Sequence, residues 1–528
     1  MLTAILAAMS TKARLFLAPF AFVLSLAMPA TVVARPNIVF ILADDFSSDL
    51  VRFMPNLQRM QKDGIDFANY FITNSLCCPS RSSILTGKLP HNTRVLTNTR
   101  PNGGYAGFNA NGNREATIAL ALQRAGYRTA MMGKYLNGYE PTADGPPPGW
   151  DEWAVAGNGY RGFNYDLNQT GRVVHYGNAA GDYMTDVLSN LGQAFVRKAA
   201  GQPFFLEIAT FAPHGPYVPA PRDASAFPGL AAPRNAAFGA RPDDAAPEWL
   251  RAIPPLSPNE LRNIDRAYRL RAQAVQAIDK MIGDLRTLLA ASGEAENTYI
   301  VFSSDNGYHM GEYSLSPGKM TAYDTDIHVP LVIVGPGIPP GAVARNFALN
   351  VDLAATFADL AGASAPLAPD GRSLVPLFAG QPVADWRQAA LVEHLRPARF
   401  DDNDPDMPGA AANPTTYAAL RTATALYVEY ASGEVSYYDL ARDPFALKNV
   451  AASLAAAEKT RLHNQLYAFV QCRGATACWE AGRLTVAATA PVGPAVPVGI
   501  APGGRRGAGP SPGERPNRPF PNRQAPVR

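Results

Sequence analysis

The hydrophobic pattern divides the chain into short apolar runs and longer amphipathic segments. Runs rich in β-branched or apolar residues predict strands buried on both faces at 37–42, 203–209, 298–302 and 329–334, with a shorter run at 127–132. Residues 264–291 place apolar side chains on one helical stripe that stops at Ser292-Gly293, and a second helix is expected at 116–125. Strands alternating with helices predict an α/β domain with a largely parallel sheet.

The pattern changes near residue 385. Runs at 418–430 and 435–439, followed by a helical segment at 451–469, predict a small antiparallel sheet with one helix. We therefore expect a large domain over 35–384 and a small C-terminal α+β subdomain over 385–487. Residues 488–528 are mostly Pro, Gly, Ala and Arg, so they form a tail that cannot bury enough apolar surface to become ordered.

The N-terminal segment has the features of an export signal. Two basic residues precede an uncharged stretch at 15–34, and Val32 and Ala34 suit cleavage by a signal peptidase. We expect residues 1–34 to be a signal peptide and the mature chain to be secreted or periplasmic, with no stable membrane partner. The stretch is long enough to span a bilayer, so an uncleaved anchor is the alternative.

The charge distribution excludes one class of partner. The net charge is +3, and residues 501–528 alone contain six Arg against one Glu, so the rest of the chain is slightly acidic. We therefore expect no nucleic acid partner.

Four cysteines are present, in two pairs. Cys472 and Cys478 are spaced for a disulfide that closes a short loop, as in exported proteins. The adjacent Cys77 and Cys78 need a different explanation.

Polar residues follow the predicted strands. These residues are Asp44 and Asp45, Lys134, His214, and Asp305 and Asn306. Since the carboxyl ends of parallel strands meet at one edge of a sheet, we expect a single site there. The carboxylate and amide oxygens suit Ca²⁺, or Mg²⁺, and do not suit zinc. Helix caps and turns are the alternative role for such residues.

The segment Cys77-Cys78-Pro79-Ser80-Arg81, followed by Thr86-Gly87, is the most specific motif. Pro79 suits the first turn of a helix, whose N-terminus favours an anionic substrate, and Arg81 adds a cation near the same position. The motif therefore predicts a site for a tetrahedral anion. A plain buried thiol at Cys77, or a bridge to Cys78, is the alternative.

This segment resembles the signature of the sulfatase family, Cys-x-Pro-Ser-Arg with Thr-Gly five residues on, and every fixed position matches. The resemblance implies an alkaline-phosphatase-like fold and a maturase that oxidises Cys77 to formylglycine (3-oxoalanine). It also implies a Ca²⁺ (or Mg²⁺) ion held by Asp44, Asp45, Cys77, Asp305 and Asn306. The catalytic residues implied are Cys77, Arg81, Lys134, His214 and Lys319, the last within Pro317-Gly318-Lys319.

One position departs from the family pattern. Many sulfatases carry a histidine two residues after the first lysine, assigned to opening the sulfated intermediate, and here that position is Leu136. Asn137, His91 or His309 are the alternatives for this role.

Further motifs look most like N-acetylglucosamine-6-sulfatases, among them Gly-Lys-Tyr-Leu-Asn at 133–137 and Asp-Asn-Gly-Tyr-His at 305–309. The resemblance implies a sulfated glycan or small molecule as substrate. The alternatives are an arylsulfatase of broad specificity, a phosphonate or phosphodiester hydrolase on the same scaffold, and a noncatalytic glycan-binding protein whose Cys77 is never converted.

Overall fold

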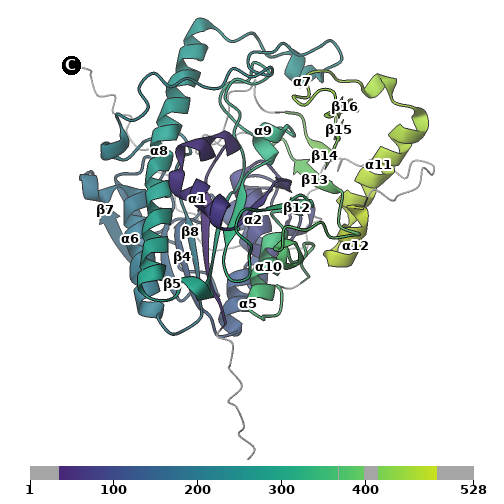
Figure 1. Cartoon of the computed structure of the whole chain (residues 1–528). Coiled ribbons are helices and arrows are strands. Elements are labelled where there is room, and N and C mark those ends of the chain that lie inside the picture. Colours follow the sequence, from purple (N-terminus) through teal and green to yellow (C-terminus); the bar gives the residue numbers. More distant parts are fainter. Residues whose placement is uncertain (1–34, 367, 398–413, 484–528) are drawn as a thin grey trace, which may run out of the picture. The chain divides into compact units, whose positions relative to one another are not determined.

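The computed structural model describes residues 35–366, 368–397 and 414–483 (Figure 1). The predicted signal peptide and the predicted tail lie outside the described residues. The limits of the two predicted domains stay predictions.

The largest element is a ten-stranded sheet with the order β11-β2-β10-β9-β1-β8-β4-β5-β6-β7. Its strands are β1 (Asn37–Ala43), β2 (Ile65–Phe67), β4 (Arg128–Lys134), β5 (Glu152–Ala156), β6 (Tyr165–Gln169), β7 (Arg172–Tyr176), β8 (Phe204–Ala209), β9 (Thr298–Ser304), β10 (Leu331–Val334) and β11 (Ala342–Ala344). The central strands β9, β1, β8, β4 and β5 are parallel, whereas β10, β6 and β7 run antiparallel to their neighbours. The expected mixed, mostly parallel sheet is confirmed.

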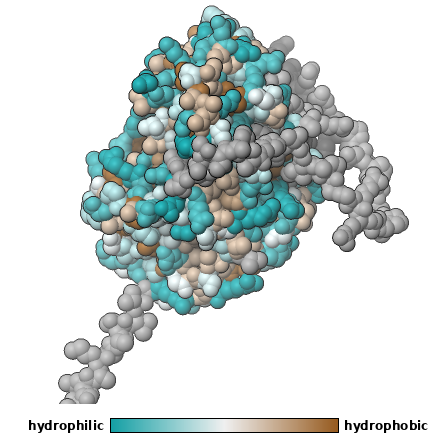
Figure 2. Space-filling view, turned by 90° about the vertical axis from the view of Figure 1, so that its right-hand side faces the viewer, coloured by the Kyte–Doolittle hydropathy of each residue, from teal (hydrophilic) through white to brown (hydrophobic). Residues whose placement is uncertain are grey.

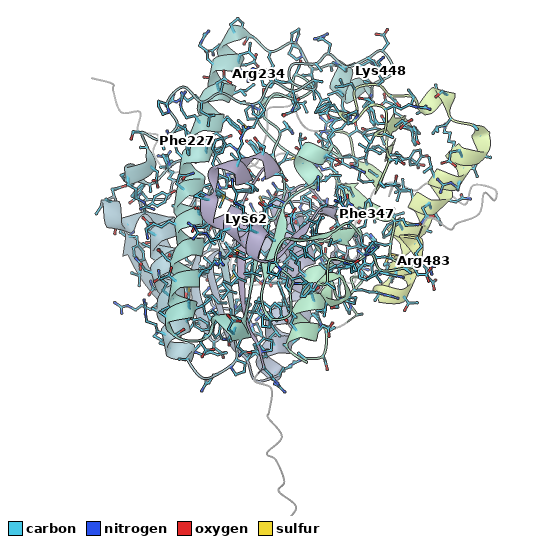
Figure 3. All side chains as sticks on the ribbon, in the orientation of Figure 1. Lys62, Phe227, Arg234, Phe347, Lys448 and Arg483 are labelled. Atoms are coloured by element: carbon cyan, nitrogen blue, oxygen red, sulfur yellow. A yellow bond between two sulfur atoms is a disulfide. The ribbon has the colours of Figure 1, made fainter. Side chains whose placement is uncertain are left out.

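Helices cover both faces of this sheet (Figure 1). One face packs against α2 (Cys77–Thr86), α5 (Ile118–Arg124) and α10 (Asp352–Leu360), and the other against α1 (Pro55–Asp63), α6 (Met184–Ala199) and α8 (Pro258–Ala291). Within β1, Phe40 belongs to the first core and Val39 to the second. Burial on both faces explains the long apolar run within β1, and side chains fill the layers between sheet and helices (Figure 3).

The long helix α8 begins six residues before the predicted start. Ser257 is its N-cap and forms a capping box with Glu260, and Pro258 occupies the first turn. The first turn is polar and has no apolar periodicity, so the prediction from the hydrophobic stripe placed the start of the helix too late.

The second sheet is antiparallel, with the order β13-β14-β15-β16. It consists of β13 (Ala389–His394), β14 (Tyr417–Thr422), β15 (Ala425–Tyr430) and β16 (Val435–Asp439), followed by α11 (Ala456–Gln471) and α12 (Gly474–Ala481). The small antiparallel sheet is confirmed, although the run predicted at 418–430 is two strands joined by a turn. The Cys472–Cys478 disulfide is also confirmed, and it connects α11 to α12.

The second sheet contacts the segments that lead into the site. The backbone N–H of Glu393 donates to the carbonyl of Thr73 at 2.9 Å, and the hydroxyl of Tyr417 donates to the carbonyl of Met320 at 2.9 Å. The remaining short elements are β3 (Tyr70–Phe71), β12 (Ala348–Leu349), α3 (Pro90–Thr93), α4 (Gly104–Ala110), α7 (Glu248–Arg251) and α9 (Asp324–Ile327).

Within the described ranges, no helix combines the length and the apolar character that crossing a membrane requires. Hydrophilic residues are interspersed with small hydrophobic areas on the face shown in Figure 2. The large apolar side chains exposed in the described residues are Val173 on β7, Val343 on β11 and Phe445 in the segment after β16. Such scattered positions are usual on protein surfaces.

Candidate active site

All nine predicted site residues lie in one buried cluster at the carboxyl end of the parallel strands. Asp44 and Asp45 follow β1, Lys134 ends β4, His214 lies beyond β8, and Asp305 and Asn306 follow β9. Cys77 and Arg81 come from the first turns of α2, and Lys319 from the loop before α9. The structure thus brings together residues from six segments, as the strand-end argument predicted.

Cys77 is the first residue of α2 and is fully buried. Its sulfur lies 3.2 Å from Oδ1 of Asp44, and Nζ of Lys319 donates to it at 2.9 Å. No bond joins it to Cys78, which points into the hydrophobic core beside it. Burial raises the pKa of the Cys78 thiol to about 12, so this second thiol is neutral.

Arg81 lies one turn after Cys77 and is held by two contacts. Its Nε donates to Oδ2 of Asp305 at 2.7 Å, and its Nη1 donates to the carbonyl of Lys134 at 2.7 Å. Its Nη2 is buried, lies 3.9 Å from Oδ2 of Asp44 and has no hydrogen-bond partner among the described residues. One guanidinium N–H group is therefore available to an anion in the site.

Each lysine of the cluster contacts one aspartate. Nζ of Lys134 lies 2.5 Å from Asp44, and Nζ of Lys319 lies 2.5 Å from Asp45. Burial alone would raise the pKa of Asp44, but Lys134, His214 and Arg81 outweigh it and hold that pKa below its ordinary value of 3.8. Burial alone would lower the pKa of Lys134, and Asp44 reverses this. Both groups are charged at neutral pH.

The oxygen atoms at the centre suit a divalent cation. Asp44, Asp45, Cys77 and His214 each offer one ligand atom, and all four atoms lie within 4.8 Å of one another. Asn306 donates from Nδ2 to Asp45 at 2.6 Å, while its Oδ1 is buried and has no hydrogen-bond partner among the described residues. Carboxylates together with an unsatisfied amide oxygen fit Ca²⁺ or Mg²⁺.

His214 faces the same centre. Its Nδ1 lies 2.8 Å from the carbonyl of Gly215, to which it donates, so its Nε2 points to Oδ2 of Asp45 at 3.5 Å. His214 was predicted from the sequence as a catalytic residue. In the structure its ring nitrogen also lies among the atoms that could hold a cation.

His91, His309 and Asn137, the three residues considered in place of the family histidine, make different contacts. His91 uses Nδ1 with Glu393 and Nε2 with the carbonyl of Cys472, both at 2.9 Å, which holds it away from the cluster. Nδ1 of His309 is 2.9 Å from Asp326. Asn137 instead donates to the hydroxyl of Tyr160 at 3.4 Å.

Tyr160 was not predicted from the sequence. Nζ of Lys134 lies 4.9 Å from the centre of its ring, and the ring of His214 lies 4.6 Å away. No motif surrounds it, so only the folded chain reveals its place beside two site residues. Asn137 contacts Tyr160, whereas His309 is buried beside Lys319, with its backbone bonded to that of Gly318 at 2.8 and 3.1 Å.

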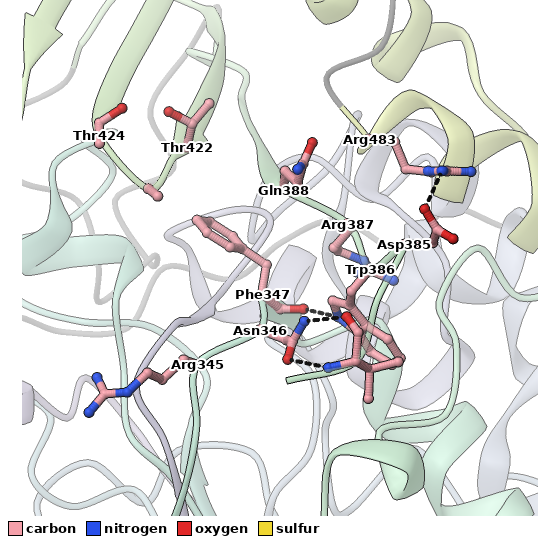
Figure 4. A pocket seen from close by; sticks show the side chains of 12 residues that line it. Arg345, Asn346, Phe347, Asp385, Trp386, Arg387, Gln388, Thr422, Thr424 and Arg483 are labelled. Atoms are coloured by element: carbon pink, nitrogen blue, oxygen red, sulfur yellow. Dashed lines mark hydrogen bonds and ion pairs between the residues drawn. The ribbon is translucent and has the colours of Figure 1, made fainter. Parts of the chain in front are cut away.

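A separate cavity of about 550 Å³ is lined by residues 345–347, by 385–388 before β13, and by 422–424 at the turn between β14 and β15 (Figure 4). Its lining includes three arginines, of which Arg387 is paired with Asp352 at 2.7 Å and Arg483 with Asp385 at 3.0 Å. None of the nine predicted site residues lines it.

The fold and the cluster define a class of α/β hydrolases that act on a tetrahedral anion. The sulfatase family model matches residues 36–363, and the model of the N-sulphoglucosamine sulphohydrolase C-terminal region matches residues 311–471. The chain belongs to the sulfatase family and is a sulfuric ester hydrolase.

Relatives with established names cover most of the chain. It is 35% identical over 477 residues to the N-acetylglucosamine-6-sulfatase of Homo sapiens, covering 84% of this chain and 86% of the relative. The same enzyme of Capra hircus is 35% identical over 477 residues, with 84% of each chain covered. These matches confirm the resemblance stated from the motifs.

A solved structure supports the fold independently. A protein determined in complex with its substrate, D-glucosamine-2-N,6-O-disulfate, superposes with a TM-score of 0.70 and 24% identity, covering 81% of this chain and 96% of that chain. The match confirms the expected alkaline-phosphatase-like architecture.

Proposed function

We propose that this sulfatase hydrolyses sulfate esters of sugars such as N-acetylglucosamine 6-sulfate, through a formylglycine at position 77 and a bound divalent cation. The observation that carries this proposal is the position of the Cys77 sulfur between Asp44 Oδ1, at 3.2 Å, and Lys319 Nζ, at 2.9 Å. In the mature enzyme the hydroxyls of hydrated formylglycine replace this sulfur, so a nucleophile stands between a proton acceptor and a cation.

The first step transfers the sulfuryl group to residue 77. One hydroxyl of the hydrated aldehyde loses its proton to a carboxylate and its oxygen attacks sulfur, while the bond from sulfur to the ester oxygen breaks. The contact with Cys77 supports Asp44 as the carboxylate, and Asp45 is the second candidate. Arg81, Lys134 and Lys319 neutralise the sulfuryl oxygens in the transition state.

His214 acts here as an imidazolium: its Nδ1–H is held by the carbonyl of Gly215, and the proton on its Nε2 passes to the departing alcohol oxygen. In the second step the other hydroxyl of residue 77 gives its proton to Nε2 of His214, which the first step left unprotonated. Its C–O bond becomes a carbonyl, and the bond from carbon to the sulfate oxygen breaks. Sulfate leaves, and water hydrates the regenerated aldehyde. Asn137 directly follows Leu136, which occupies the position of the missing histidine, and it donates to the hydroxyl of Tyr160 at 3.4 Å.

Asp44, Asp45, Asp305 and Asn306, with the oxygen of residue 77, would hold the cation. The unsatisfied Oδ1 of Asn306 supports this set. When bound, Ca²⁺ or Mg²⁺ supplies positive charge beside the attacking oxygen.

The relatives named as N-acetylglucosamine-6-sulfatases support a sugar 6-sulfate as substrate. The Cys472–Cys478 disulfide supports an exported, secreted or periplasmic chain, as does the expected signal at 1–34. We further propose a catalytic domain over 35–384 and a small subdomain over 385–487. A maturase that oxidises Cys77 is the required partner.

A substrate panel tests this proposal. The full mature chain, produced with a formylglycine-generating maturase, is assayed on N-acetylglucosamine 6-sulfate, an aryl sulfate, a phosphonate monoester and a phosphodiester. We expect the highest kcat/KM on the sugar sulfate. A higher value on either phosphorus ester would overturn the sulfatase assignment of the site, and a higher value on the aryl sulfate would overturn the sugar specificity.

A further inference from the structure

Arg271, in the middle of α8, is a fully buried arginine. Within the described part of the chain, no aspartate or glutamate lies within 4.0 Å of its guanidinium, and its Nε and Nη1 have no hydrogen-bond partner. Burying a guanidinium in this way costs several kcal/mol, so a structural or functional contact must offset it.

The hydrogen bonds of Arg271 go to the loop after β1, the first of the two loops that carry the proposed cation-binding oxygens. Its Nη2 donates to the backbone carbonyl of Asp45 at 2.6 Å and to Oγ of Ser47 at 2.9 Å. The N–H of the same peptide, that of Phe46, donates to Oγ of Ser304 at 3.0 Å. The peptide between residues 45 and 46 is therefore held at both ends.

This peptide needs to be held because Asp45 has a left-handed backbone, with φ of 59°. For a residue other than glycine this conformation costs on the order of 1 kcal/mol and persists only when its surroundings enforce it. The backbone angles of Asp45 set the direction of its carboxylate, which meets Lys319, Asn306 and His214.

Arg271 also contacts the second loop. The centre of the Tyr308 ring lies 4.4 Å from its guanidinium carbon, and the carbonyl of Tyr308 accepts a hydrogen bond from Ser47 at 2.8 Å. Tyr308 comes two residues after Asn306. One arginine thus joins the loop after β1 to the loop after β9, and these two loops carry all four cation-binding oxygen residues.

We propose that Arg271 is a positioning residue that fixes the Asp45 peptide and joins the two loops, so that the divalent cation meets a preformed set of oxygens. The inference rests on the cation of the proposed function and deepens it. Contacts outside the ligand set that orient metal ligands typically account for 10- to 100-fold in metal affinity.

The test measures Ca²⁺ binding without catalysis. The full mature chain is stripped with EDTA and titrated with Ca²⁺ by isothermal calorimetry, for the wild type, Arg271→Gln and Arg271→Lys. Arg262→Gln, an exposed arginine on the same helix, is the matched control. We expect Arg271→Gln to bind Ca²⁺ about 10- to 100-fold more weakly, Arg271→Lys to lie between it and the wild type, and the control to equal the wild type.

Near-ultraviolet circular dichroism and the Tm in EDTA verify that each variant is folded. If Arg271→Gln does not fold, Arg271→Lys, which keeps the charge and one donor, decides the question with an expected loss of at least threefold. Folded variants with wild-type Ca²⁺ affinity would overturn the role of Arg271 alone. A wild-type chain that binds neither Ca²⁺ nor Mg²⁺ would instead overturn the cation of the proposed function, and the inference with it.

Discussion

The sulfur of Cys77 lies 3.2 Å from the carboxylate of Asp44, although 33 positions separate the two residues in the sequence. The other carboxylate oxygen of Asp44 is 2.5 Å from Nζ of Lys134. A helix N-terminus, the end of β1 and the end of β4 therefore meet at one carboxylate. Substitutions in this site should change catalysis, whereas substitutions outside it should change the stability of the fold.

Replacing Cys77 with serine should stop the enzyme after one turnover. A single hydroxyl can accept the sulfuryl group but cannot expel sulfate by forming a carbonyl, so the ester accumulates with a mass gain of about 80 Da. Intact-mass measurement after incubation with substrate detects it. The control is Cys78→Ala, which removes the neighbouring buried thiol; its kcat should stay within about threefold of the wild type when the protein is folded. Continued turnover by Cys77→Ser, produced in a host without a serine-oxidising maturase, would contradict the proposed role of residue 77.

Lys319→Met should reduce kcat/KM by about 10²- to 10³-fold, because it removes a buried cation placed 2.9 Å from the Cys77 sulfur. Lys280→Met is the matched control, since Lys280 forms an exposed pair with Asp284 on α8. Steady-state kinetics on a sugar sulfate compare the two. Equal activity of both variants would exclude Lys319 from the transition state.

His91 should contribute pH-dependent stability rather than catalysis. Burial lowers its pKa, but Glu393 beside the ring outweighs this and raises the pKa to about 9, from an ordinary value of 6.5. The pKa of His91 is higher in the folded chain than in the unfolded chain, so protonated His91 stabilises the fold. This stabilisation is fully present below pH 6.5 and is lost as the pH rises through 9. It is on the order of 3 kcal/mol of unfolding free energy. Urea unfolding of the wild type and His91→Gln between pH 6 and 9.5 measures it.

In His91→Gln the fall in unfolding free energy over this range should be smaller, and kcat on a small sulfate ester should change less than about threefold at pH 7. A loss of activity without a change in stability would return His91 to the list of candidate bases.

Removing the disulfide should destabilise the chain without altering the chemistry. The Cys472–Cys478 bond closes a short loop, with a sequence separation of six, so the double Cys→Ala variant should lose about 2 kcal/mol of unfolding free energy. Chemical denaturation measures this loss. A comparable fall in kcat of the folded variant would show that the C-terminal helices act on the site.

The sequence predicted the central strands β1 and β8 because strands buried on both faces are almost entirely apolar; the exceptions are Asn37 in β1 and Glu207 in β8. It did not predict the short strands β2, β5 and β11, nor β6 and β7 at the edge of the sheet, where β7 exposes Arg172, Val173 and His175. Because β7 is partly exposed, it carries polar residues and lacks the continuous apolar run from which strands such as β1 and β8 were predicted. The earlier start of α8 could have been found, since Ser257 and Glu260 have the spacing of a capping box.

The sequence predicted that site residues would lie together where they directly follow strands or belong to a motif, as Asp44, Asp305 and Cys77 do. Arg271 could not be predicted in this way. It lies beside the apolar stripe of α8, and its partners on the loops after β1 and β9 are brought to it only by the packing of that helix on the sheet. Tyr160 is a similar case, because its contacts with Lys134 and His214 join segments without a shared motif.

The most direct test of the central claim is the mass of the peptide containing residue 77, from the full chain purified from its own host. The account predicts a mass about 18 Da below that of the cysteine form, as conversion of the thiol to the aldehyde requires, and turnover that rises with the converted fraction. An unconverted Cys77 in protein that still hydrolyses sulfate esters at full rate would contradict it.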